Sequence, residues 1–161
     1  MSFSVLTWAF VVAVTIHNLE EALYLPKWSR AAGRFHHPVG ATEFRFAVII
    51  LTALAAACAI AASARSVVGL YLLCGFALAM ALNVFVPHVA ATIVLRRYMP
   101  GTATGLLVVL PVCSLLLRAA FHARLIEAKT FAWSAPLVVI VIVGMIPPLF
   151  WIGRNLSPRG T

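Results

Sequence analysis

The sequence contains little charge. Only 10% of its 161 residues are charged and 63% are hydrophobic, whereas soluble domains average about 25% charged residues. This excludes an ordinary soluble domain and indicates an integral membrane protein. The chain also lacks long polar stretches, low-complexity tracts and clear internal repeats. We therefore expect one helical-bundle domain over residues 1–161.

Cysteine pairs and a cleavable leader are also missing. Cys58, Cys74 and Cys113 lie in apolar runs without a nearby Cys or His partner, which excludes a cysteine zinc site and a disulfide framework. The first apolar run has no basic residues before it and no convincing cleavage site, so we expect it to remain as a helix. The net charge of +8 comes from basic residues at the ends of apolar runs. We expect these residues to contact lipid headgroups rather than nucleic acid.

Five apolar runs are long enough to cross a bilayer, which takes about 20 helical residues. They cover residues of about 3–25, 44–62, 67–95, 102–121 and 131–152. The sequence therefore predicts an all-α membrane protein with five transmembrane helices. Pro26 should begin an interfacial connection that carries His36 and His37, and we expect exposed interfacial histidines there rather than metal ligands. Pro87 should kink the third helix and Pro111 should bend the fourth.

The first apolar run contains His17-Asn18-Leu19-Glu20-Glu21, which includes two of only four acidic residues. A charged side chain at the bilayer centre costs roughly 2.5–3.5 kcal/mol, so these carboxylates need partners, protons or a metal ion. Residues at i, i+3 and i+4 of a helix point towards a common side. We therefore expect His17, Glu20 and Glu21 to converge on one bound species, while Asn18 and Leu19 point elsewhere.

Basic residues predict the orientation in the membrane. The N-terminus and the second and fourth connections share one side, with Arg65, Arg124 and Lys129. The other side carries Lys27, Arg30, Arg34, Arg96, Arg97, Arg154 and Arg159. The positive-inside rule then places the N-terminus outside and the C-terminus in the cytoplasm.

This topology brings two histidines to one depth. At a rise of about 1.5 Å per residue, His17 lies roughly 12 Å and His88 roughly 10 Å from the cytoplasmic ends of their helices. The predicted catalytic and metal-binding residues are His17, Glu20, Glu21 and His88, and the residues expected around them are Asn83, Glu43, Arg45 and Tyr98. Glu43 is explained equally well as the cap of the second helix. His122 should lie at the opposite face, outside the site.

Two imidazoles and one or two carboxylates suit a divalent transition metal such as zinc, iron or manganese. The same groups could form a metal-free acid–base site or a purely structural polar network. The leading interpretation is an intramembrane enzyme for a lipophilic or amphipathic substrate, with isomerisation, cyclisation, hydrolysis and oxidation all open. The alternatives are a metal-ion or proton transporter or channel, and a membrane scaffold or regulatory subunit.

Three motifs together resemble the HXXEE family of bacterial integral membrane proteins. The first is His17-Asn18-Leu19-Glu20-Glu21, the second is a further histidine matched by His88, and the third is a Y-x-P-G motif matched by Tyr98-Met99-Pro100-Gly101. The resemblance covers the first three helices. It implies a protein of the bacterial inner membrane and supports the predicted site, and it leaves the reaction open.

Overall fold

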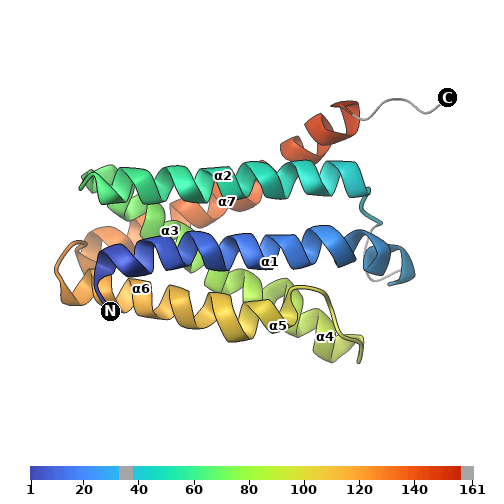
Figure 1. The fold of residues 1–161 in the computed structure, drawn as a ribbon, viewed down its shortest axis with the longest axis horizontal. Helices are drawn as coiled ribbons and strands as arrows, with labels where there is room; N and C mark the ends of the chain where they lie inside the picture. Colours follow the sequence, from blue (N-terminus) through green and yellow to red (C-terminus); the bar gives the residue numbers. More distant parts are fainter. Residues whose placement is uncertain (33–37, 157–161) are drawn as a thin grey trace.

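The structure is a computed structural model that describes residues 1–32 and 38–156. Five long helical segments follow one another along the chain (Figure 1). The first, second and fifth are α1 (Phe3–Ala31), α2 (Ala41–Ser63) and α7 (Ala128–Leu156). The third joins α3 (Val67–Asn83), η2 (Val84–Val89) and α4 (Ala90–Val94), and the fourth joins α5 (Thr102–Thr104), η3 (Gly105–Val109) and α6 (Leu110–His122). All five are long and apolar enough to cross a membrane, which confirms the predicted fold class.

The five segments pack side by side as a bundle. Helix α1 contacts α2 and α6, and α3 contacts α2, α6 and α7. Helix α7 closes the bundle against α2 and α3. The start of α1 and the end of α7 lie at opposite ends of the bundle (Figure 1), as an odd number of membrane crossings requires.

Small residues let the helices approach closely. Ala55, Ala59 and Ala62 are buried along one side of α2. A Cβ atom on Gly69 would lie 2.8 Å from the backbone nitrogen of Ala62, so the start of α3 packs directly on the end of α2. Such packing is typical of membrane helices, because leaving lipid gives no hydrophobic gain. Large apolar side chains such as Leu107 remain exposed on the outside.

Helix α1 continues to Ala31, so the predicted end at Pro26 is wrong. A proline has no N–H, and Pro26 therefore leaves the carbonyl oxygen of Ala22 without its helical donor. Arg45 of α2 donates to this oxygen from Nε at 3.2 Å. The side chain of a neighbouring helix thus replaces the missing donor, and the helix passes through the proline.

The kink predicted at Pro87 is confirmed. Val86 has non-helical backbone angles, φ −131° and ψ 112°, within the wide turn η2, and the Val86-Pro87 peptide bond is cis. His88 follows directly and belongs to this irregular turn rather than to a regular helix. In the fourth segment, the wide turn η3 precedes Pro111, where the sequence predicts a bend.

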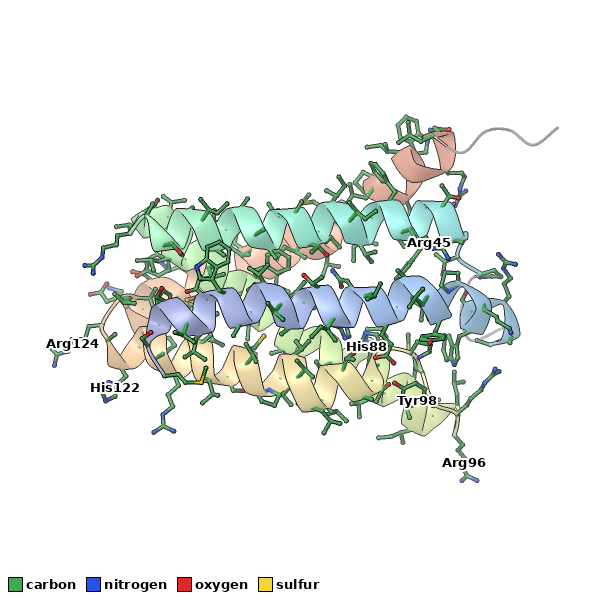
Figure 2. All side chains as sticks on the ribbon, viewed as in Figure 1. Arg45, His88, Arg96, Tyr98, His122 and Arg124 are labelled. Atoms are coloured by element: carbon green, nitrogen blue, oxygen red, sulfur yellow. The ribbon has the colours of Figure 1, made fainter. Side chains whose placement is uncertain are left out.

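The polar ends of the bundle are well separated. Figure 2 shows Arg96 and Tyr98 at one end and His122 and Arg124 at the other. His88 lies inside the half of the bundle that ends at Tyr98 (Figure 2). His36 and His37 lie outside the described residues.

Candidate functional site

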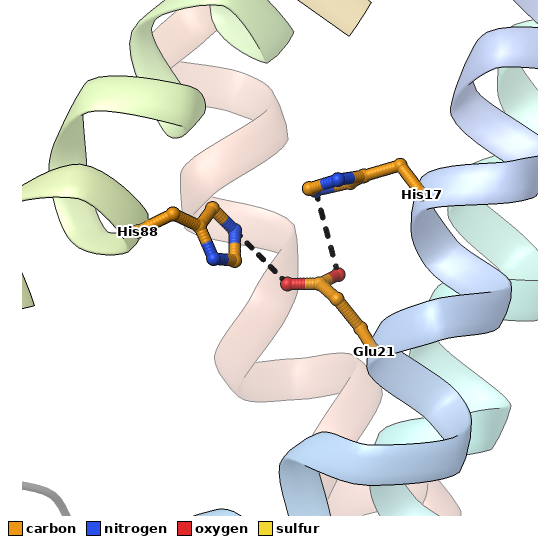
Figure 3. Close-up of side chains that lie close together, drawn as sticks. All are labelled: His17, Glu21 and His88. Atoms are coloured by element: carbon orange, nitrogen blue, oxygen red, sulfur yellow. Dashed lines mark ion pairs between the residues drawn. The ribbon is translucent and has the colours of Figure 1, made fainter. Parts of the chain in front are cut away.

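Two imidazoles and one carboxylate meet inside the bundle. His17 and Glu21 lie one turn apart on α1, and both imidazoles face the Glu21 carboxylate (Figure 3). Glu21 lies 3.1 Å from Nε2 of His88 and 3.9 Å from Nε2 of His17. The imidazole rings meet edge to face with centroids 5.0 Å apart. All three residues are buried, with 0% of His17, 1% of His88 and 8% of Glu21 exposed.

Asn83 lies between the two imidazoles. Its amide nitrogen is 3.1 Å from Nε2 of His88 and 3.4 Å from Nε2 of His17. Nε2 of His88 therefore faces both the amide donor and the Glu21 carboxylate. One ring nitrogen cannot accept from Asn83 and donate to Glu21 at the same time. A cation bound by the imidazole and carboxylate lone pairs would remove this conflict.

The donor set fits a divalent transition metal. His17, Glu21 and His88 each offer one donor atom, and these atoms lie within 4.8 Å of one another. At metal distances of about 2.0–2.2 Å and tetrahedral angles, two ligand atoms lie about 3.4 Å apart. The imidazole nitrogens of His88 and His17 lie 3.1 and 3.9 Å from the two different carboxylate oxygens of Glu21, on either side of this value. Small side-chain movements would bring the three donors onto one ion and leave a coordination position open.

Glu20 points to a different set of partners. Its carboxylate accepts hydrogen bonds from the hydroxyl groups of Tyr98 and Thr104, the second at 2.6 Å. Oγ1 of Thr104 also lies 3.0 Å from Nδ1 of His17. Glu20 therefore connects to His17 through Thr104, at the ring nitrogen that does not face Glu21. The structure does not bring Glu20 together with the three potential ligands.

The turn with sequence Tyr98-Met99-Pro100-Gly101 packs against both imidazoles. Gly101 has φ +93°, and a Cβ atom on it would lie 2.5 Å from Cε1 of His88 and 3.0 Å from Cε1 of His17. Glycine suits both the left-handed backbone and the close approach. Partial burial and the hydrogen bond to the Glu20 carboxylate raise the pKa of Tyr98 above its ordinary value. The phenol therefore remains a donor to Glu20 at neutral pH.

Two residues predicted around the site have other partners. Glu43 accepts a hydrogen bond from the backbone N–H of Gly40 at 2.8 Å and pairs with Nε of Arg154 at 2.9 Å. It caps the start of α2, which is the explanation that the sequence left open. Arg45 binds the backbone of α1. Asn83 and Tyr98 therefore lie in or beside the site. Glu43 instead caps a helix, and Arg45 donates to a backbone oxygen that lacks its helical donor.

A cavity of about 320 Å³ lies beside the buried group, lined by residues of α1, α2, α3 and α7. Its walls are mainly apolar, and its polar lining residues are Asn18, Glu21 and Asn83. Glu21 is the only charged residue in this lining over the described part of the chain. The volume is within the range of about 300–1,000 Å³ typical of small-molecule sites. Glu21 thus contacts the imidazoles and also borders a space suited to an apolar molecule.

Sequence reasoning missed Asn18 and Thr104. Asn18 was expected to point away from the site, yet it lines the cavity and donates to Oγ1 of Thr52 at 2.7 Å. Thr104 lies at the start of an apolar span, and no sequence signal distinguishes it. Its position next to His17 and Glu20 arises because the turn before α5 folds back onto α1.

The fold and the site define a five-helix membrane protein with a buried His/Glu group. The chain belongs to the HXXEE family, since residues 8–116 match the family described as "Protein of unknown function with HXXEE motif". It is 40% identical over 151 residues to "Uncharacterized protein YrkK" of Bacillus subtilis (strain 168), an alignment that covers 92% of this chain and 96% of that protein. No solved structure matches the chain. The family indicated by the three sequence motifs is thereby confirmed.

Proposed function

We propose that this protein is a small intramembrane enzyme that uses a divalent transition metal to act on a lipophilic or amphipathic molecule. One observation carries the proposal. The carboxylate of Glu21 lies against His17 and His88 on one side and lines an apolar cavity on the other. A potential metal site and a potential substrate site therefore share one residue.

His17, Glu21 and His88 would hold the metal, and zinc, iron and manganese all accept this set of ligands. A bound metal would supply polarisation of a substrate oxygen or activation of a water molecule. Asn83 donates towards both imidazoles and can hold the two rings in place. Isomerisation, cyclisation, hydrolysis and oxidation all fit this arrangement.

The metal-free form of the proposal uses the same residues as an acid–base pair. Glu21 and His88 lie 3.1 Å apart and can share one proton, which Glu21, the member of the pair that lines the cavity, can deliver to a molecule there. Metal content separates the two forms, because only the first requires a metal ion.

The cavity lining supports an apolar substrate. Aromatic and aliphatic side chains dominate it, and no lysine or arginine contributes to it among the described residues. A molecule with one polar group could place that group at Glu21 and Asn83 and leave its hydrocarbon part against Phe44, Phe76 and Phe150. Such a molecule would enter from the bilayer or from its interface.

The distribution of basic residues supports a site in the cytoplasmic half of the bacterial inner membrane, with the N-terminus outside and the C-terminus in the cytoplasm. Arg96 lies at the same end of the bundle as Tyr98 (Figure 2). In this orientation the candidate site is nearer to the cytoplasmic face than to the outer face.

The proposal is tested by metal analysis of the full chain, purified with a tag that does not bind metals and supplied with zinc, iron(II) or manganese in turn. We expect about one ion per chain in the wild type and strongly reduced occupancy in His17→Ala, Glu21→Gln and His88→Ala, because a three-ligand site has few substitutes nearby. His122→Ala is the matched control at the other end of the bundle. The same occupancy in all four variants, or no metal in the wild type, would contradict metal dependence.

A second arm of the experiment addresses transport. Apart from Thr7 and Ser134, the buried residues in the half of the bundle near the start of α1 are apolar, so no chain of buried charges crosses the described part. Liposomes with the reconstituted protein should therefore show no more proton or divalent-metal flux than empty liposomes. Flux that disappears in Glu21→Gln would instead support a transporter.

A further inference from the structure

Thr104 and Glu20 form a hydrogen-bonded connection to His17 that the proposed chemistry does not use. Oγ1 of Thr104 lies 2.6 Å from Oε2 of Glu20 and 3.0 Å from Nδ1 of His17. The other carboxylate oxygen of Glu20 accepts from the hydroxyl of Tyr98, and that hydroxyl in turn accepts from the backbone N–H of Ala103 at 3.2 Å. The connection therefore joins a buried imidazole to the turn before α5.

The direction of these bonds follows from counting protons. Tyr98 and Thr104 each donate to a different oxygen of Glu20, which is the pattern of an ionised carboxylate, because a carboxylate is an acceptor only. A threonine hydroxyl has one proton, and Thr104 uses it for Glu20 at 2.6 Å rather than for the carbonyl oxygen of Gly101 at 3.5 Å. The Thr104 oxygen can then only accept from His17, so Nδ1 of His17 carries the ring proton.

This assignment decides where the lone pair of His17 lies. A neutral imidazole has one protonated nitrogen and one acceptor nitrogen. With the proton on Nδ1, the lone pair is on Nε2, which is the atom that faces Glu21 at 3.9 Å and Asn83 at 3.4 Å. With the proton on Nε2, His17 could not bind a metal at this position.

We infer that Thr104, held by Glu20, is a positioning residue that fixes His17 as the Nδ1-protonated tautomer and directs its Nε2 lone pair at Glu21 and His88. The two glutamates of the motif then have separate tasks, Glu21 in the site and Glu20 in the orientation of His17. Only the consequence for metal binding rests on the proposed function, because the tautomer is a property of the metal-free protein.

The other imidazole provides an internal contrast. Nδ1 of His88 is buried and makes no hydrogen bond within the described part of the chain. The polar neighbours of His88, the Glu21 carboxylate and the Asn83 amide, both approach its Nε2, so among the described residues no hydroxyl acts on its Nδ1 as Thr104 acts on Nδ1 of His17. Removal of the Thr104 hydroxyl should therefore change the signals of His17 and leave those of His88 nearly unchanged.

The test is NMR of isotope-labelled histidine nitrogens in the full, metal-free chain, at a pH where the imidazoles are neutral. We expect the Nδ1-protonated tautomer for His17 in the wild type and in Thr104→Ser, which keeps the hydroxyl. In Thr104→Val, which keeps the shape, the Nε2-protonated tautomer should become populated. Glu20→Ala should have the same effect, because the Thr104 proton is then free to point at His17.

Thr15→Val is the matched control, since the Thr15 hydroxyl donates to the carbonyl of Val11 on its own helix, at 2.7 Å. It should leave the His17 tautomer unchanged. An unchanged tautomer in both Thr104→Val and Glu20→Ala would overturn the inference. If one of these variants does not fold, the other still decides the outcome.

Zinc affinity gives the second measurement. Loss of a group that orients a metal-binding histidine typically lowers the affinity for the metal by 10- to 100-fold. We expect such a loss in Thr104→Val and near wild-type affinity in Thr104→Ser. If the wild type binds no zinc, the proposed metal dependence fails while the tautomer measurement still stands. If zinc binds and the tautomer does not respond, the inference fails on its own.

Discussion

Two buried carboxylates of this protein have opposite surroundings. Glu43 and Glu21 are both 8% exposed. Glu43 accepts from a backbone N–H and pairs with the guanidinium of Arg154, so its charge is compensated within the fold. Glu21 faces the imidazoles of His17 and His88 and has no lysine or arginine as an ion-pair partner among the described residues.

The difference separates a structural role from a functional one. A carboxylate in a low-dielectric region needs a compensating positive charge or a proton. Arg154 meets that need for Glu43 permanently. The imidazoles meet it for Glu21 only when they carry a proton or share a cation with it. A carboxylate whose charge is balanced only by a proton or a cation that can come and go is suited to catalysis.

The largest effect expected from this comparison is on stabilisation by zinc. A ligand that binds only the folded state, present at 100 times its dissociation constant, adds about 2.7 kcal/mol to the free energy of unfolding. Zinc should therefore raise the melting temperature of the wild type and of Glu43→Gln in thermal unfolding in detergent. It should have little effect on Glu21→Gln. Equal zinc stabilisation of both variants would remove the functional distinction between the two carboxylates.

A smaller effect is expected on stability without metal. Glu43→Gln should lower the free energy of unfolding by about 1 kcal/mol, since the Arg154 side chain is 71% exposed and partly exposed ion pairs are worth little. Glu21→Gln should cost less than this in metal-free protein, because it removes a buried charge without a permanent partner. Arg154→Gln is the control and should match Glu43→Gln. A larger loss for Glu21→Gln than for Glu43→Gln would indicate a structural role for Glu21.

The smallest effect concerns Glu20, which is held by hydroxyl groups. Burial, the larger cause, and the Glu20 carboxylate both raise the pKa of Tyr98 above its ordinary value of about 10. In Glu20→Gln the pKa of Tyr98 should fall towards 10 and remain above it, because burial is unchanged. Absorbance titration measures this, with Tyr98→Phe to identify the signal. No change in Glu20→Gln would contradict an ionised Glu20 as the acceptor.

The sequence predicted the fold because its information is local. Long apolar runs indicate membrane helices by length and composition, and a proline such as Pro87 indicates a kink through its missing N–H. The end of α1 could not be predicted in this way. Pro26 removes one helical donor, which favours a kink or an end of the helix, and the donor that replaces it comes from Arg45 on another helix.

The sequence also could not predict that Glu20 and Glu21 have different partners. Helical spacing places residues i+3 and i+4 on a common side of His17, and it does not say which ring nitrogen each one approaches. That is decided by Thr104 on one side and His88 on the other, both from distant parts of the chain. For Glu43 the sequence left two explanations open, because Arg154 follows more than 100 residues later.

The hydrogen bond from Arg45 to the carbonyl oxygen of Ala22 also links α1 to α2 close to the site. Ala22 directly follows Glu21, and neighbouring residues of a helix point about 100° apart. A large rotation of α1 about its own axis would move this oxygen out of reach of Arg45 on α2. Pro26 leaves the carbonyl oxygen of Ala22 free, and this oxygen binds Arg45 of α2. The bond helps to keep α1 in one orientation relative to α2, next to Glu21, which borders the cavity.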